Sequence, residues 1–194
     1  MQTRQRLGSI YSIKCITTLT DAGQQELLIE RNKYDVRKWM DDKSSITTEQ
    51  HNAFLEKLRF SKRNRYLVVM RHGNIAGVYS IKGVHQQTAV GGFWVTESTR
   101  NSLLALSVVY YAIDHIFSRC NIRVIIGHQL SENKGASKLN RLLGFSIYDE
   151  FCSGARRYHR LELGIRKWRE EVSYSARVLK LIEVAEKVNE NKSF

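Results

Sequence analysis

The fold of this chain is decided by residues 91–105, which read GGFWVTESTRNSLLA. The first five residues are apolar or glycine and predict a strand, and the apolar spacing that follows predicts a helix over about 100–118. A second strand over Ile122–Gly127 and a second helix over Asn133–Leu143 come next along the chain. A strand, a helix and a strand in succession predict a parallel strand pair joined by a crossover.

The flanking segments predict antiparallel strands and further helices. The turn signal His72-Gly73-Asn74 separates two apolar runs of a three-strand meander, and Ser153-Gly154 marks a terminal hairpin. The expected strands are Ser9–Ile16, Arg65–Arg71, Ile75–Val84, Thr88–Thr96, Phe145–Phe151 and Arg157–Leu163. The expected helices are Asp21–Met40 with a break near Asn32–Tyr34, one from Thr47 or Thr48 to about Arg59 that starts with a capping hydroxyl, and Ile165–Lys192. We therefore predict an α/β fold of the α+β type, with a mixed, mostly antiparallel sheet flanked by helices. The domain covers 1–163, and a helical extension covers 164–194.

The composition is that of a folded globular chain with an anionic partner. Of 194 residues, 31 are Lys or Arg and 19 are Asp or Glu, which gives a net charge of +12. This excess favours nucleic acid, a lipid surface or a phosphorylated small molecule. Cys15, Cys120 and Cys152 form no CxxC pair, and the sequence has no zinc pattern and no aromatic RNA-binding motif. We therefore expect no metal and no nucleic-acid partner. Because no apolar stretch is long enough for a membrane span, we expect a soluble cytoplasmic protein without membrane contact.

The loop Thr96–Thr99 leads directly into the predicted helix at Arg100. The N-terminus of a helix presents unpaired N–H groups and a partial positive charge, so it can hold a pyrophosphate, and Arg100 adds a formal charge there. An ordinary capped helix that binds nothing fits the same residues.

Two short motifs follow a known cofactor-binding pattern. In the first, RNSLLA over 100–105, Arg100 and Ala105 match the pattern and Leu103 stands where glycine is usual. The matches in the second motif are Asn133, Ala136, Leu139, Gly144 and Phe145, with Asn140 where tyrosine is common. Both resemble the acetyl-CoA-binding core of the GNAT N-acetyltransferases. The stretches ERN at 30–32, VRKWM at 36–40 and EQH at 49–51 resemble one branch of that family, the sugar-nucleotide N-acetyltransferases of nonulosonic-acid and surface-polysaccharide pathways.

The resemblance covers about residues 9–163 and implies a sheet whose two parallel strands splay apart around acetyl-CoA, the expected co-substrate. The pyrophosphate would lie on the N–H groups of residues 100–105, and a backbone N–H near Trp94 or Val95 would polarise the thioester carbonyl. The residues expected to bind acetyl-CoA are Trp94, Val95, Arg100, Asn101, Ser102, Leu103, Leu104, Ala105 and Asn133.

Two proton transfers accompany amine acetylation. A base or a water chain must take a proton from the acceptor amine, and the candidates are Glu97, His128 and His85. Glu97 would equally stabilise the helix dipole, His128 would equally be a hydrogen-bonded residue at a strand end, and His85 would equally be a solvated turn residue. The departing thiolate needs a proton that the Asn140 amide cannot supply at neutral pH, so water or Tyr148 is the expected donor.

The resemblance implies that the N-terminal half holds the acceptor. The expected substrate-binding residues are Arg31, Asn32, Arg37, Lys38, Trp39, His51 and His85. The cations would bind a nucleotide diphosphate or form a solvated face, and Trp39 would stack on a sugar or base or pack in the core. We expect acetyl transfer to a primary amine of a nucleotide-linked amino sugar, by direct attack in a ternary complex. The alternatives are a protein N-terminus as acceptor and a non-catalytic binding module. The last helix would pack on its own sheet or form a homodimer.

Overall fold

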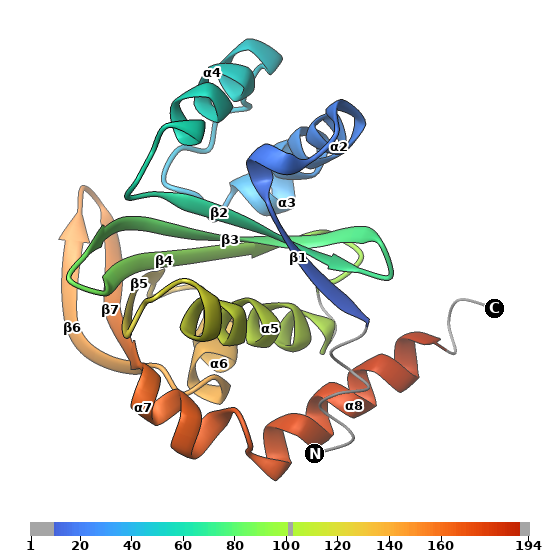
Figure 1. Ribbon diagram of the computed structural model, residues 1–194. Helices are drawn as coiled ribbons and strands as arrows, with labels where there is room; N and C mark the ends of the chain where they lie inside the picture. The colour runs from blue at the N-terminus through green and yellow to red at the C-terminus, as the bar shows by residue number, and fades with distance from the viewer. Residues whose placement is uncertain (1–9, 101–102, 191–194) are drawn as a thin grey trace.

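A single sheet organises the part of the chain that the computed structural model describes, residues 10–100 and 103–190. Within those residues seven strands lie in the order β1-β2-β3-β4-β5-β7-β6 (Figure 1). The strands are β1 Tyr11–Cys15, β2 Arg65–Arg71, β3 Asn74–His85, β4 Thr88–Val95, β5 Val124–Leu130, β6 Ser146–Ser153 and β7 Arg156–Gly164. The mixed α/β fold expected from the sequence is confirmed.

The pairing of the strands is antiparallel except at the centre of the sheet. Strands β1 to β4 form a meander, and β5, β7 and β6 form a second antiparallel group. The two groups meet through the parallel pair β4–β5, as the predicted crossover requires. That pairing starts at Thr88–Val124 and stops at Gly91–Gly127, although both strands continue beyond it.

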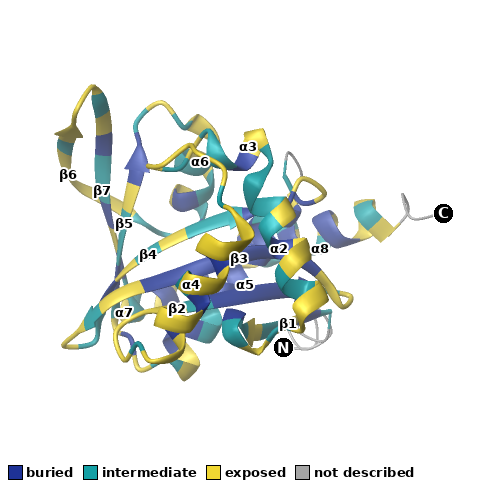
Figure 2. Ribbon diagram, turned by 90° about the horizontal axis from the view of Figure 1, so that it is seen from above, coloured by how far each residue is buried: buried dark blue, intermediate teal, exposed yellow. Residues whose placement is uncertain are grey.

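Helices cover both faces of the sheet (Figure 1). We call the face under α2 Asp21–Asn32, α3 Tyr34–Arg37 and α4 Thr48–Arg59 the α2–α4 face. The opposite face, under α5 Leu104–Arg119 and α6 Lys134–Leu142, is the α5–α6 face. Each face has its own buried cluster: α5 packs on Tyr79, Ala89 and Ile125, whereas α4 packs on Val68 and Val78. Figure 2 shows the buried segments concentrated in the central strands, while the edge strand β6 is largely exposed.

Helix boundaries follow the local side-chain chemistry. The break between α2 and α3 and the capping box of Thr47 and Gln50 at the start of α4 are confirmed. Helix α5 begins at Leu104 rather than near Arg100. The reason is that the Thr96 and Thr99 hydroxyls lie 3.2 and 2.8 Å from the carbonyl of Ala76, which holds this loop in a turn on β3.

The C-terminal segment is helical but not continuous, which corrects the expected unbroken helix over 165–192. Helix α7 Ile165–Lys167 runs into the π-helical turn η2 Trp168–Val172, and α8 Ala176–Glu190 follows after a turn. The Tyr110 hydroxyl donates to the Ser173 carbonyl at 2.6 Å in that turn. Trp168 and Ile182 belong to the same buried cluster as α5, so the segment packs on the α5–α6 face of its own sheet. None of the helices in the described ranges is long and apolar enough to cross a membrane.

Candidate active site

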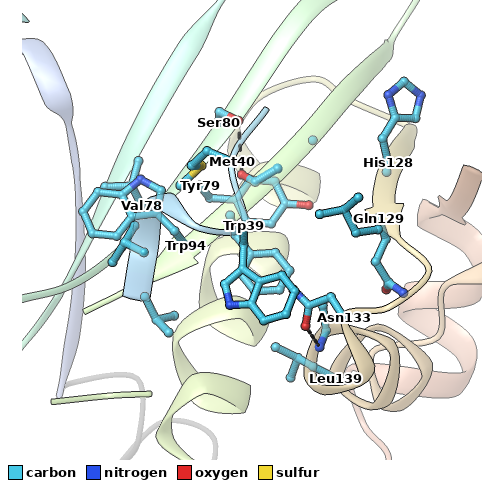
Figure 3. A pocket seen from close by; sticks show the side chains of 18 of the residues that line it. Trp39, Met40, Val78, Tyr79, Ser80, Trp94, His128, Gln129, Asn133 and Leu139 are labelled. Atoms are coloured by element: carbon cyan, nitrogen blue, oxygen red, sulfur yellow. Dashed lines mark hydrogen bonds between the residues drawn. The ribbon is translucent and has the colours of Figure 1, made fainter. Parts of the chain in front are cut away.

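The opening between β4 and β5 is the centre of the candidate site. Beyond Gly91 and Gly127 the facing backbone edges of 92–95 and 128–130 are not joined by the ladder that holds the strands together earlier. A cavity of about 1050 Å³ lies here, lined by residues of β3, β4, β5, α2, α4, α6 and the segment 35–42 (Figure 3). The strands splay as the resemblance implied, and their free backbone edges offer hydrogen bonds to an extended ligand arm.

The alternation of side chains along β5 divides the cavity between the two faces of the sheet. Figure 3 shows His128 and Gln129 pointing in opposite directions from neighbouring positions. The Gln129 side chain faces α6, where its Oε1 accepts from Asn140 Nδ2 at 2.7 Å and its Nε2 donates to Ser137 Oγ at 2.6 Å. His128 faces the α2–α4 side and packs against the Phe151 ring, with centroids 5.2 Å apart.

Most residues expected to bind acetyl-CoA line this cavity. Those that do are Trp94, Val95, Arg100, Leu103, Ala105 and Asn133. Leu104 is buried and is not part of the lining, and Asn101 and Ser102 lie outside the described residues. The Arg100 guanidinium donates to the Val95 carbonyl at 3.3 Å and lies 3.9 Å from Asp35.

The start of α6 forms the other wall of the cavity. Asn133 caps this helix by accepting the Ala136 N–H at 3.0 Å, and the neighbouring Lys134 and Lys138 line the cavity. These ammonium groups and Arg100 give this end a positive charge that suits the phosphates of CoA. The residues present therefore fit the expected co-substrate in shape, free backbone groups and charge.

The structure separates the three base candidates. Glu97 lies outside the cavity lining, is 69% exposed at its side chain and pairs with Lys33 at 3.0 Å. His85 is exposed at the β3–β4 hairpin, also outside the lining. The β4–β5 pairing stops at Gly91 and Gly127, and we call this point the fork. His128 lines the cavity directly after it. Burial lowers the pKa of His128 below its ordinary value. The positive charges of Arg160 and Lys82 lower it further, and the negative charge of Asp41 opposes them. His128 is therefore neutral at pH 7 and able to accept a proton.

The structure does not bring Tyr148 to the cavity. It lies on the edge strand β6 with 54% of its surface exposed, at a register shift of the β6–β7 ladder. Three tyrosines that the sequence reasoning did not single out line the cavity: Tyr66 of β2, Tyr79 of β3 and Tyr158 of β7. No local motif marks them, because the pairing of the strands decides which strand residues face the cavity.

Four of the expected substrate-binding residues line the α2–α4 part of the cavity: Arg31, Lys38, Trp39 and His51. Figure 3 shows the Trp39 indole pointing into the cavity, toward the end that Asn133 lines. Arg31 Nη2 reaches the Asp42 carbonyl at 3.4 Å, while Nη1 is buried and has no hydrogen-bond partner among the described residues. Burial lowers the pKa of Arg31, but a guanidinium remains charged at neutral pH.

His51 lines the cavity and bonds to α2 through one ring nitrogen. Its Nε2 lies 3.0 Å from Gln24 Oε1, and the Gln24 amide nitrogen donates to the Ile16 carbonyl, so His51 Nε2 carries the proton. Burial lowers the pKa of His51, so the ring is neutral and Nδ1 is an acceptor.

Asn32 and Arg37 do not line the cavity but hold the loop after α3. The Asn32 side chain makes two hydrogen bonds of 2.8 Å with the backbone of Ile46, and Arg37 donates to the Lys43 carbonyl at 2.6 Å. The other end of this loop is tied to β7. There Arg156 donates to the Met40 carbonyl and the Tyr158 hydroxyl donates to Asp41, each at 3.0 Å. The loop thus bridges the two halves of the sheet over the cavity.

The match to a family model decides which family this architecture represents. Residues 31–145, which include both walls of the cavity, match the acetyltransferase (GNAT) family. This chain belongs to the GNAT acetyltransferases. It is therefore an acyltransferase that moves an acetyl group from acetyl-CoA to an amine, and the family resemblance read from the sequence is confirmed.

Individual relatives agree with the family at low identity. Acetyltransferase PseH of Campylobacter jejuni is 24% identical over 140 residues, which cover 70% of this chain and 86% of the relative. The crystal structure of the same protein superposes with a TM-score of 0.65 at 18% identity, over 80% of this chain and 99% of that chain. A Vibrio cholerae spermidine N-acetyltransferase with CoA and spermine superposes with a TM-score of 0.73 at 16% identity, over 84% and 99% of the two chains. A ribosomal alpha-N-protein acetyltransferase bound to CoA superposes with a TM-score of 0.69 at 12% identity, over 81% and 95%. These likenesses establish the fold and leave the acceptor open.

No cluster of three His, Cys, Asp or Glu side chains suited to a metal ion occurs in the described part of the chain.

Proposed function

We propose that this enzyme acetylates the amino group of a nucleotide-linked amino sugar, which it binds on the α2–α4 face while acetyl-CoA lies in the β4–β5 opening. The observation that carries the proposal is Arg31. Its buried Nη1 has no partner among the described residues, and it lines the cavity. A buried N–H without an acceptor is costly, and a diphosphate oxygen would satisfy it with a charge-assisted hydrogen bond.

The charge of the cavity supports an anionic acceptor. Its basic lining residues are Arg31, Lys38, Lys82, Arg100, Lys134 and Lys138, and its acidic ones are Asp35, Asp41 and Asp42. The α6 lysines and Arg100 suit CoA, which leaves Arg31, Lys38 and Lys82 for the second substrate. A polyamine acceptor would be repelled by such a lining. The sequence resemblance to sugar-nucleotide N-acetyltransferases points to the same class of acceptor.

The aromatic and imidazole side chains supply the remaining contacts. Trp39 is 40% exposed and available to stack on a base or sugar ring, and His51 Nδ1 can accept a hydrogen bond from a hydroxyl. His128 lies on the same face as these groups, directly after the fork. It is therefore placed to take the proton of an amine that attacks a thioester held in the opening.

The proposed mechanism is a direct attack in a ternary complex. The free N–H groups of β4 hold the donor arm as an added strand and polarise the thioester carbonyl. The amine nitrogen forms a bond to the carbonyl carbon, His128 takes the amine proton, and the carbon–sulfur bond breaks with its electron pair on sulfur. Two bound substrates aligned in one cavity need no covalent intermediate on the enzyme.

The test compares acceptors by turnover and by binding. Thiol release from acetyl-CoA is measured with a UDP-linked amino sugar, spermidine and an N-terminal peptide, and UDP alone is tested as a competitive inhibitor. We expect turnover with the sugar nucleotide and competition by UDP. In Arg31→Gln we expect a KM for the sugar nucleotide about 10–100-fold higher, because one charge-assisted hydrogen bond contributes about 1.5–3 kcal/mol. Arg177→Gln, an exposed position on α8, is the matched control and should leave KM unchanged. Turnover with spermidine or the peptide alone would overturn the proposal.

A further inference from the structure

The position that holds a tyrosine in many GNAT enzymes is occupied here by a side chain already engaged elsewhere. Asn140 is 8% exposed, and its amide nitrogen donates to Gln129, whose own amide donates to Ser137. An amide does not release a proton at neutral pH. The group that protonates the CoA sulfur must therefore come from another part of the cavity wall, or from solvent.

The buried phenol of Tyr79 lies on the α5–α6 face of the sheet, the face on which Asn140 and Gln129 also lie. It lies on β3 opposite Phe93 of β4, is 3% exposed, lines the cavity and packs in the cluster under α5. Its ring stacks on Phe93 with centroids 6.3 Å apart, and this contact fixes the direction of the side chain. As part of the cavity lining it is available to a ligand that enters the opening.

Gly91 is what allows the Tyr79 hydroxyl to reach the fork. A Cβ placed on Gly91 would lie 2.7 Å from the Tyr79 hydroxyl oxygen and 2.7 Å from Ile125 Cγ2. The phenol therefore rests against the backbone of the last residue at which β4 still pairs with β5. An extended arm that enters between the strands has its inner end at this point.

We propose that the Tyr79 hydroxyl donates a hydrogen bond to the departing CoA thiolate and stabilises it, a role that rests on the proposed acetyl transfer but not on the identity of the acceptor. As the carbon–sulfur bond breaks, the electron pair stays on sulfur, the Tyr79 O–H donates a hydrogen bond to it, and a proton from solvent converts the thiolate to a thiol. The proton taken by His128 from the amine passes to solvent, which balances the proton that solvent gives to the sulfur. One amine and one thioester thereby give one amide and one thiol.

His128 and Tyr79 lie on opposite faces of the sheet, and their protonation states suit different roles. Burial raises the pKa of Tyr79 well above its ordinary value, so the phenol stays protonated through the physiological range and is a donor rather than a base. The other tyrosines compete poorly for this role. Tyr66 packs against Phe54 in the cluster under α4, the Tyr158 hydroxyl is already bonded to Asp41 on the α2–α4 side, and Tyr148 lies outside the cavity.

The first test follows the thiol of bound CoA, which needs no acceptor. Tyr79→Phe removes one oxygen and keeps the ring. A hydroxyl that donates to sulfur favours the thiolate, so the ultraviolet thiolate absorbance of CoA bound to the wild-type protein should exceed that in Tyr79→Phe by about tenfold at pH 7. The Kd of acetyl-CoA, whose sulfur carries no charge, should change less than twofold. Equal thiolate absorbance in both proteins would overturn the proposal.

The second test is turnover with its rescue. A preorganised hydrogen-bond donor to a developing anion contributes about 100-fold or more, so kcat of Tyr79→Phe should fall by about that factor, and Asn140→Tyr added to it should restore part of the loss. Tyr11→Phe is the matched control, because it removes a buried hydroxyl bonded to Glu186 and should lower Tm without lowering kcat.

An unchanged kcat in Tyr79→Phe refutes the role of Tyr79 and leaves acetyl transfer standing. Absence of wild-type turnover with every amine refutes the proposed function, while the thiolate measurement still tests Tyr79. Should the double variant fail to fold, the thiolate measurement decides alone.

Discussion

Removing part of one α8 side chain should reveal how strongly the C-terminal segment belongs to the domain. Ile182 is fully buried and lies in the cluster that α5 shares with the sheet. Ile182→Ala deletes buried methyl and methylene groups and leaves a cavity, which costs about 3 kcal/mol within a range of about 2–5. For a chain of this size each kcal/mol lowers Tm by about 2–4 °C, so the expected loss is about 6–12 °C.

The measurement is thermal unfolding followed by fluorescence or circular dichroism, with kcat recorded at 25 °C. Val188→Ala is the control on the same helix, because Val188 is 48% exposed and its truncation should cost less than about 0.5 kcal/mol. We expect a single transition for both variants and normal kcat at 25 °C. Equal Tm values for Ile182→Ala and the wild-type protein would show that α8 does not contribute to the stability of the domain.

Three further predictions concern the cavity. Arg100→Ala should raise the KM for acetyl-CoA about tenfold without changing that of the acceptor, since it removes a cation from the CoA end; calorimetric titration of acetyl-CoA checks this. His128→Asn should lower kcat about 100-fold. The wild-type kcat/KM should also fall as the pH drops through the pKa of His128, below about 6.5, because the base must be unprotonated. If the variant shows the same fall at low pH as the wild-type protein, His128 is not the base. Gly91→Ala should cost about 1–3 kcal/mol by thermal unfolding, as its Cβ would meet two atoms at 2.7 Å, whereas in Gly127→Ala the nearest atom is 3.4 Å away and the loss should be smaller.

Periodicity and turn chemistry predicted most of the fold. The strand over Arg65–Arg71 is found as expected, and so is the α4 cap, because both depend on residues close together in the sequence. Two boundaries were wrong for a tertiary reason. The Thr96 and Thr99 hydroxyls bond to β3, and the segment near Ser173 bonds to α5, so each helix changes where it meets a distant partner.

The site was predictable only where a motif carried it. The cofactor pattern placed Arg100 and Asn133 on the cavity wall. The roles of Asn32 and Arg37 in holding a loop were not visible, because a basic or amide side chain reads the same whether it faces a ligand or a backbone carbonyl. Tyr79 was missed because only the register with β4 and the missing side chain at Gly91 bring its hydroxyl to the fork.

The placement of His128 and Gln129 on opposite sides of one strand has a consequence for how such an enzyme changes its substrate. Under the proposed function, substitutions on α2 and α4 would reshape the acceptor side of the cavity, while Gln129 and the α6 residues that it contacts on the α5–α6 face would stay unchanged. Selection can therefore act on the two compartments separately. A one-residue deletion in β5 would undo that independence, because it would exchange the inward and outward side chains of the strand at a stroke.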